Sequence, residues 1–88
     1  MIITEHESFK KAYQKRIVRN QNLAARTKER IRMFAENPRN PFLGDHALVG
    51  KKSRLRAFSV TGDIRIVYYP AADNRALFLD IGTHPQVY

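Results

Sequence analysis

One stretch decides the fold: Leu55-Arg56-Ala57-Phe58-Ser59-Val60-Thr61-Gly62-Asp63-Ile64-Arg65-Ile66-Val67-Tyr68-Tyr69. Its first part alternates with a period of two and leads into Thr61-Gly62-Asp63, which is a turn sequence. The residues that follow, Ile64 to Tyr69, are β-branched or aromatic and predict a second strand. Strands that are joined by a short turn are antiparallel neighbours. We therefore expect a β-hairpin here.

The chain on the C-terminal side of this hairpin predicts one more strand. Pro70 is expected to stop the preceding strand, and Ala72-Asp73-Asn74 is expected to form a turn. Residues Ala76 to Ile81 then read as a third strand. Its apolar residues are expected to share one face: Leu77, Leu79 and Ile81.

The N-terminal half predicts a short strand over residues 1–4 and then two helices. Ser8 is expected to cap the first helix, in which apolar residues recur with i, i+4 spacing from Phe9. The break Asn20-Gln21-Asn22 offers a second N-cap, and the apolar stripe that follows runs to about Glu36. Asn37-Pro38 ends this helix. The short turn between the helices makes them antiparallel.

Residues 38–52 are rich in Pro and Gly, and we expect them to form an ordered loop that carries His46. The complete pattern is β-α-α-β-β-β, which places the chain in the α+β class. A two-helix hairpin is expected to cover a mainly antiparallel sheet. With 88 residues the chain has room for a single domain, residues 1–88.

The charge balance narrows the classes of partner. Sixteen Lys and Arg stand against eight Asp and Glu, which gives a net charge of +8. This surplus favours nucleic acid, an acidic protein or an anionic membrane surface. The absence of Cys excludes disulfides, thiolate metal sites and thiol nucleophiles. No export signal or spanning segment is recognisable, so we expect a cytoplasmic protein.

The basic residues form two groups. Nine of them lie between Lys10 and Arg32, and we interpret these as a solvated helical surface. The second group is expected to gather near one region of the sheet and to bind RNA phosphates. An alternative is that its members form ion pairs with Asp45, Asp63 and Asp80. The group consists of Lys51, Lys52, Arg54, Arg56 and Arg65.

Three histidines are the candidates for proton transfer near neutral pH. His84 is the strongest, because it stands in Gly82-Thr83-His84-Pro85 at the rim of the sheet, where a bend and a proline hold it. His46 follows Asp45, which can orient it, although a local capping role fits equally well. His6 has no evident role.

The remaining motifs exclude other chemistry. No histidine spacing is typical of zinc sites, and the four glycines are isolated, so no phosphate-binding loop is present. No metal or other cofactor is therefore expected. His, Arg and Tyr together are the groups that cleave a phosphodiester by general acid/base catalysis, with a cation stabilising the charge on phosphorus.

Several segments together resemble the RelE/ParE superfamily of bacterial type II toxins, and most of all its YafQ-like branch. They are the loop Gly44-Asp45-His46-Ala47-Leu48-Val49-Gly50, the arginine-bearing hairpin 55–69, and the ending that runs from Gly82-Thr83-His84 to Val87-Tyr88. The resemblance implies an endoribonuclease, an mRNA interferase that enters the ribosomal A site. It also implies a cognate antitoxin that holds the toxin inactive.

The resemblance also implies roles for single residues. His84 matches the proton donor of the branch, and His46 matches its loop histidine. Asp63 matches an aspartate at the hairpin turn, Arg65 a catalytic arginine, and Tyr88 an aromatic that stacks on or assists the scissile nucleotide. The chain departs from the branch at three positions, where a histidine, a tryptophan and an arginine are replaced by Ser59, Ile64 and Asp80. Arg65 is expected to take over the work of the missing arginine.

Two alternatives remain open from the sequence. The ParE-like arm of the same superfamily inhibits DNA gyrase, has no nuclease site, and needs neither His84 nor Arg65. A basic module that binds RNA or an acidic protein without catalysis would need none of the site residues. For the antitoxin, we expect an acidic, partly disordered segment that folds as a helix over a groove and the basic surface.

Overall fold

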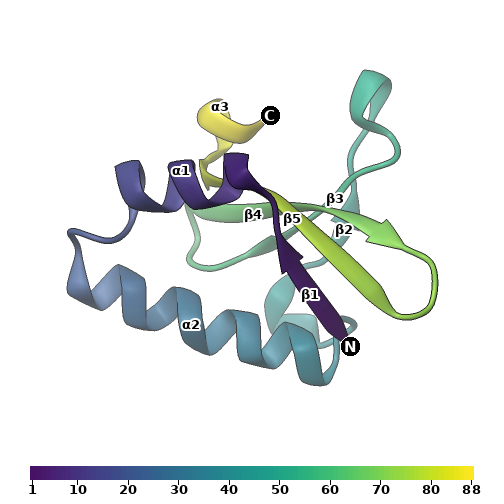
Figure 1. The fold of residues 1–88 in the computed structure, drawn as a ribbon, viewed down its shortest axis with the longest axis horizontal. Helices are drawn as coiled ribbons and strands as arrows, with labels where there is room; N and C mark the ends of the chain where they lie inside the picture. The colour runs from purple at the N-terminus through teal and green to yellow at the C-terminus, as the bar shows by residue number, and fades with distance from the viewer.

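The computed structural model describes residues 1–88 and shows a five-stranded sheet with the strand order β1-β5-β4-β3-β2 (Figure 1). β1 pairs with β5 in parallel, and every other pair is antiparallel. The α+β class and the mainly antiparallel sheet are thus confirmed. The elements are β1 (Ile2–Glu5), α1 (Glu7–Arg16), α2 (Gln21–Glu36), β2 (His46–Ala47), β3 (Arg56–Ser59), β4 (Ile64–Ala71), β5 (Arg75–Thr83) and α3 (His84–Val87), with 3₁₀ turns at Pro41–Leu43 and Gly50–Lys52.

The two long helices begin at side-chain caps. Asn20 caps α2 as expected, since its side chain accepts a hydrogen bond from the Leu23 N–H at 3.1 Å. The cap of α1 is His6 rather than Ser8, because the imidazole Nδ1 accepts from the Ser8 N–H at 3.0 Å. The two helices run in opposite directions (Figure 1). None of the helices combines the length and the hydropathy of a membrane-spanning segment.

Apolar side chains form a cluster on each face of the sheet. The main core lies between the sheet and the helices α1 and α2, and includes four fully buried phenylalanines: Phe9, Phe34, Phe58 and Phe78. A smaller cluster lies on the opposite face, beneath α3: Leu48, Ala57, Val67 and Val87. Because neighbouring residues of a strand point to opposite faces, these two clusters tell which face each polar side chain occupies.

A β-bulge in β5 changes one expected face. Val67 pairs with Asp80 whereas Tyr68 pairs with Phe78, so Leu79 is an extra residue without a partner. Ile81 consequently lies in the main core with Phe78, while Leu79 does not. The prediction that residues 77, 79 and 81 share one face was therefore wrong.

β4 continues through Pro70, which we expected to end it. Pro70 pairs with Ala76 of β5, and β4 ends at Ala71. The pairing of β4 with β3 stops at Tyr68. Pro70 thus lies where one side of β4 is a free edge, and there the missing N–H costs no bond in the sheet.

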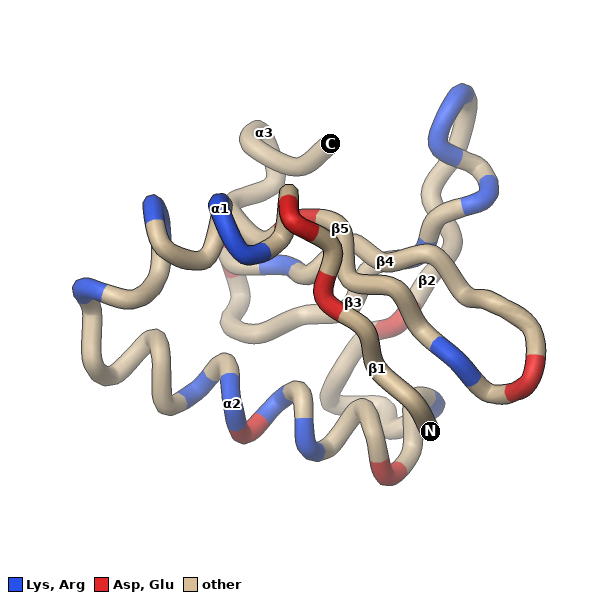
Figure 2. Tube along the Cα trace, viewed as in Figure 1, with Lys and Arg blue, Asp and Glu red and all other residues tan.

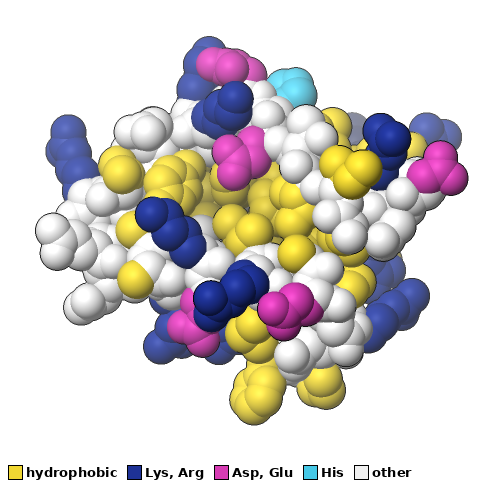
Figure 3. Space-filling model, turned by 60° about the horizontal axis from the view of Figure 1, so that its bottom comes forward, with side chains coloured by type: hydrophobic (Ala, Val, Ile, Leu, Met, Phe, Trp, Pro, Cys, Tyr) yellow, Lys and Arg dark blue, Asp and Glu magenta, His cyan; other side chains and the backbone are white.

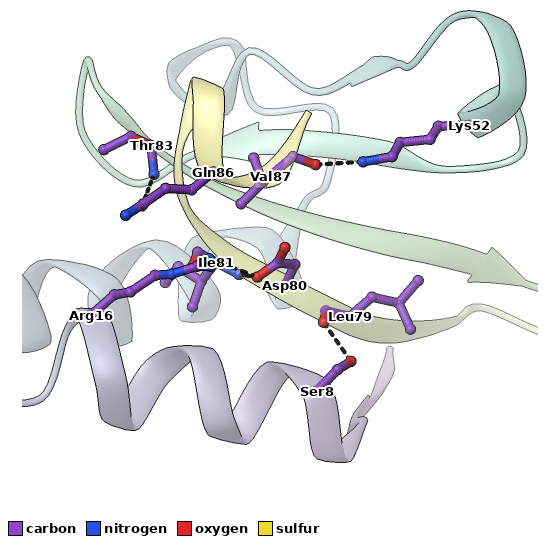
Figure 4. Close-up of polar contacts among 9 residues, drawn as sticks. All are labelled: Ser8, Arg16, Lys52, Leu79, Asp80, Ile81, Thr83, Gln86 and Val87. Atoms are coloured by element: carbon purple, nitrogen blue, oxygen red, sulfur yellow. Dashed lines mark hydrogen bonds and ion pairs between the residues drawn. The ribbon is translucent and has the colours of Figure 1, made fainter.

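The edge of β5 is covered by α1 where β1 ends. β1 pairs only as far as Phe78, and beyond it Ser8 Oγ donates to the Leu79 carbonyl at 2.7 Å. Arg16 Nη1 donates to the Ile81 carbonyl at 2.9 Å and to Asp80 Oδ1 at 3.0 Å (Figure 4). Side chains of α1 thus satisfy the carbonyls of a strand edge that would otherwise be open to another chain.

Candidate active site

A hollow of about 370 Å³ opens on the face of the sheet that carries α3. β2 and the loop that follows it form one wall, and the C-terminal residues form the other. We call it the histidine hollow. Its lining includes two of the three histidines, His46 and His84. The other side chains that line it include Leu48, Val49, Lys52 and Tyr88.

The short helix α3 positions His84. Thr83 and Gln86 form a capping box in which Gln86 Oε1 accepts from the Thr83 N–H at 2.7 Å (Figure 4). Buried Val87 anchors the helix on the second apolar cluster. This helix was not predicted from the sequence, although Thr83 followed three residues later by Gln86, with a proline in the first turn, is a recognisable start signal.

Tyr88 stands between the two imidazoles. Its ring centroid lies 4.2 Å from that of His84 and 6.3 Å from that of His46, and both pairs are edge-to-face. The Tyr88 hydroxyl is 3.3 Å from His46 Nε2. Partial burial raises the pKa of Tyr88, and the positive charge of Arg65 opposes this rise.

A backbone contact fixes the protonated nitrogen of His46. His46 Nδ1 lies 3.0 Å from the Gly44 carbonyl oxygen. A carbonyl can only accept, so Nδ1 carries the hydrogen and, in the neutral ring, Nε2 carries the lone pair. Gly44 adopts φ +57°, a left-handed conformation that favours glycine. His46 is therefore arranged to accept a proton at Nε2, on the side of Tyr88.

Asp45 holds the loop of His46 from the other face of the sheet. Its carboxylate, whose side chain is only 7% exposed, accepts from Arg56 Nε at 2.7 Å and from the Tyr68 hydroxyl. The hydrogen bond and charge of Asp45 raise the pKa of Arg56. Burial, and then the bond to Asp45, raise the pKa of Tyr68. Asp45 thus contacts these two side chains, and no hydrogen bond joins it to the neighbouring imidazole.

Arg65 lies on the same face as His84. It follows the alternation of β4 with Val67, which packs against Val87 of α3. Its Nη1 donates to Ser59 Oγ, and its charge acts on Tyr88. The structure therefore brings four of the predicted residues toward one region: His46, Arg65, His84 and Tyr88.

Other predicted residues lie elsewhere. Arg56 points to the opposite face and pairs with Asp45, the ion-pair alternative that the sequence left open. Asp63 is exposed in the β3–β4 turn and is absent from the lining of the histidine hollow. Lys51 and Arg54 are exposed on the loop between β2 and β3, which stands away from the body of the molecule (Figure 2). Lys52 alone of this loop's bases reaches the histidine hollow, where it donates to the Val87 carbonyl at 2.8 Å.

The structure contains no group of three or more His, Asp or Glu placed to hold a metal ion. The side chains of the candidate site are two imidazoles, the cations Lys52 and Arg65, and a phenol.

Comparison with solved structures finds the same fold in several bacterial toxins. A copper-bound mutant toxin from Helicobacter pylori matches with 25% identity and a TM-score of 0.75, over 100% of this chain and 99% of that one. YafQ from E. coli matches with 22% identity and a TM-score of 0.74, over 98% and 96% of the two chains. A YoeB/ParE toxin from Agrobacterium tumefaciens matches with 16% identity and a TM-score of 0.75, over 96% and 99%.

YafQ also matches in its complex with DinJ, a toxin-antitoxin complex, with 20% identity and a TM-score of 0.74, over 98% and 94% of the two chains. No protein-family model and no curated protein sequence matches this chain. The expected resemblance is confirmed by the shared fold.

Proposed function

Because this chain has the fold of the RelE/ParE superfamily and its YafQ-like branch, we propose that it is the toxin of a type II toxin-antitoxin system and cleaves mRNA on the ribosome. One observation carries the nuclease part of this proposal. Two imidazoles from distant parts of the sequence face one phenol ring, on the same side of the sheet as Arg65. These are the groups needed for proton transfer and charge stabilisation at a phosphodiester.

In the proposed reaction the RNA 2′-oxygen attacks the adjacent phosphorus. His46 Nε2 accepts the proton of the 2′-hydroxyl as the new O–P bond forms. His84 donates a proton to the 5′-oxygen as the bond from phosphorus to that oxygen breaks. The products are a 2′,3′-cyclic phosphate and a free 5′-hydroxyl, so no water and no cofactor enter this step.

The proposed roles of the cationic side chains and of Tyr88 follow from where each lies in the structure. Arg65 is proposed to stabilise the charge that builds on the phosphoryl oxygens, and Tyr88 to stack on a base. Lys52 is proposed to hold a flanking phosphate at the histidine hollow, with Lys51 and Arg54 contacting RNA from the projecting loop. Arg56 and Asp63 have no part in this step, because Arg56 lies on the opposite face of the sheet, paired with Asp45, and Asp63 is exposed in the β3–β4 turn.

The test is cleavage of mRNA on purified ribosomes by the intact chain and by His84→Ala. Loss of the proton donor is expected to lower the cleavage rate on the order of 10²-fold or more. An mRNA with a 2′-deoxy residue at the cut position should resist cleavage completely, since the attacking group is absent. Unchanged cleavage by His84→Ala would remove that residue from the chemistry. Gyrase inhibition without any RNA cleavage would favour the ParE-like alternative, and binding without either would favour a non-catalytic module.

The antitoxin is proposed to dock on the helical side of the molecule. A groove of about 520 Å³ lies between α1 and α2, with an apolar floor that includes Phe9, Tyr13 and Ile31. Lys10 and Lys28 also line it, against the single acid Glu5. Figure 3 shows apolar side chains within a hollow that charged side chains surround. Such a groove suits an amphipathic helix with acidic flanks, which also offsets part of the +8 charge.

A further inference from the structure

A second hollow, of about 220 Å³, lies on the face of the sheet opposite the histidines. Buried Phe34 and Tyr68 contribute to its lining. Three arginines from distant parts of the chain also line it: Arg39, Arg56 and Arg75. No Asp or Glu is among the lining residues. We call this site the arginine hollow.

Arg56 is held in place within this hollow. Its Nε donates to Asp45 Oδ1 at 2.7 Å, and its side chain remains 31% exposed. This bond uses one edge of the guanidinium, so the terminal Nη1 and Nη2 remain free to donate. A guanidinium already fixed by a carboxylate loses less freedom when it binds an anion than a mobile one does.

Arg39 and Arg75 add charge that nothing balances. The only ion pairs of the protein are Arg16–Asp80 and Arg56–Asp45, so neither Arg39 nor Arg75 has a carboxylate partner. Asp45 balances a single positive charge. Cations that share one hollow repel each other, and an anion that enters relieves this repulsion. Guanidinium groups match the oxygen geometry of phosphate in particular.

We propose that the arginine hollow binds a phosphate group of RNA. The sheet separates it from the histidine hollow, and the two hollows share no lining residue. The phosphate therefore belongs to a second RNA segment and not to the cleaved linkage. This assignment of RNA rests on the proposed function, whereas the binding of phosphate itself does not.

The first experiment titrates the intact chain with inorganic phosphate and follows the arginine side-chain Nε–H signals by NMR. The signals of Arg39, Arg56 and Arg75 are expected to shift together and to saturate. Arg19 and Arg32 are exposed, line no hollow, and serve as controls. Equal, unsaturated shifts at all five arginines would overturn the site.

The second experiment measures binding of a 2′-O-methyl RNA oligonucleotide, which cannot be cut because its 2′-oxygen is blocked. The variant Arg39→Gln/Arg75→Gln is expected to bind about 10-fold more weakly, and its plot of log affinity against log salt should flatten by about 0.7 for each lost phosphate contact. The matched double variant Arg19→Gln/Arg32→Gln removes the same charge and should bind within about 2-fold of the parent. Arg56 is not replaced, because it also supports Asp45.

Equal losses in the two double variants would overturn the proposal, because only overall charge would then matter. Stronger shifts of the three signals with a poly-glutamate peptide than with RNA would also overturn it, in favour of an acidic protein ligand. Phosphate saturation at the arginine hollow in a chain that fails to cleave mRNA would refute the proposed function but not the anion site. The two failures are thus distinguishable.

Discussion

Among single residues, Asp45 joins the two faces of the sheet. Its carboxylate binds Arg56 and Tyr68 on one face, while the imidazole of the next residue lies on the other. Asp45 directly precedes β2, and successive side chains of an extended backbone point in opposite directions, so a fixed Asp45 also helps to fix the direction of His46. Asp45 is therefore a positioning residue for the histidine hollow.

Asp45→Asn is expected to weaken this arrangement. The amide is uncharged and has one acceptor oxygen in place of two, so Arg56 or Tyr68 loses its acceptor, at a cost of about 1–3 kcal/mol in unfolding free energy. The mRNA cleavage rate should fall, and ¹⁵N NMR should show a smaller fraction of the His46 ring with its hydrogen on Nδ1. Asp73→Asn is the control, since Asp73 is an exposed turn residue with φ +61°. An unchanged ring population in Asp45→Asn would contradict the positioning role.

Tyr68 is expected to make the free energy of unfolding decrease at alkaline pH. Burial and then the bond to Asp45 raise its pKa in the folded chain above the ordinary value of 10.0. The folded state therefore keeps this proton at a pH where the unfolded chain has released it, and folding is penalised as pH rises beyond about 10. Tyr68→Phe should remove this part of the decline.

The measurement for Tyr68 is urea unfolding between pH 8 and about pH 11, a window that brackets the ordinary tyrosine pKa. Below about pH 10 the stabilising contribution of Tyr68 to the free energy of unfolding is fully present. This contribution is lost as the pH increases further. Tyr69→Phe is the matched control on the same strand, because Tyr69 is 41% exposed. Parallel curves for the parent and Tyr68→Phe would show that the phenol is not protected by the fold.

At the scale of whole elements, α3 depends on the glycine that precedes it. A Cβ on Gly82 would lie 2.6 Å from Gln86 Oε1 and 2.8 Å from Arg16 Nη1. Both neighbours are engaged, the first in the cap of α3 and the second on the edge of β5. The strand thus passes into the helix through a space that only glycine fits.

Gly82→Ala is expected to displace α3 and with it His84 and Tyr88. Overpacking of this kind costs about 1–3 kcal/mol in unfolding free energy, and the cleavage rate should fall further than the stability change explains. Gly62→Ala is the control, since nothing lies within 4 Å of a Cβ built there. Full activity in Gly82→Ala would show that α3 can move without harm to the site.

The sequence predicted the elements whose signals are long and local. Asn20 marks the start of α2, and the turn before Ile64 marks the central hairpin. It did not predict α3 or β2, which span four and two residues and depend on tertiary packing. The bulge at Leu79 was invisible because the registers of two strands decide it.

The candidate site was predictable in its residue types but not in its geometry. His84 and Arg65 were expected to lie together, and they share a face of the sheet. Arg56 was expected to join them, and alternation along β3 places it on the opposite face. Its neighbour Ala57 packs beneath α3, whereas Phe58 packs in the main core. The partner that holds Arg56 on that face is the buried carboxylate of Asp45, whose depth no local pattern reveals.

At the scale of the whole molecule, the sheet separates the proposed cleavage site from the proposed docking site of the antitoxin. The histidine hollow lies on the α3 face, and the groove between α1 and α2 lies on the other side. The proposed docking and the proposed cleavage should therefore respond to different substitutions.

Lys10→Glu/Lys28→Glu is expected to weaken capture of the acidic antitoxin by about 10-fold or more, through like-charge repulsion at the groove. Cleavage by the free variant should stay near the parental rate. The partner for this test is the product of the open reading frame beside the gene, and binding is measured by calorimetry. Arg19→Glu/Arg32→Glu carries the same change in charge at residues that do not line the groove. If both variants lost affinity equally, the groove would not be the docking site.

The separation of the histidine hollow from the groove between α1 and α2 also has a genetic consequence. A duplicate copy that has lost both imidazoles would keep every residue that lines the groove between the helices. It would still sequester the protecting partner, and an intact copy in the same cell would then go unguarded. A catalytically dead paralogue is thus expected to be a decoy that harms its host through abundance alone.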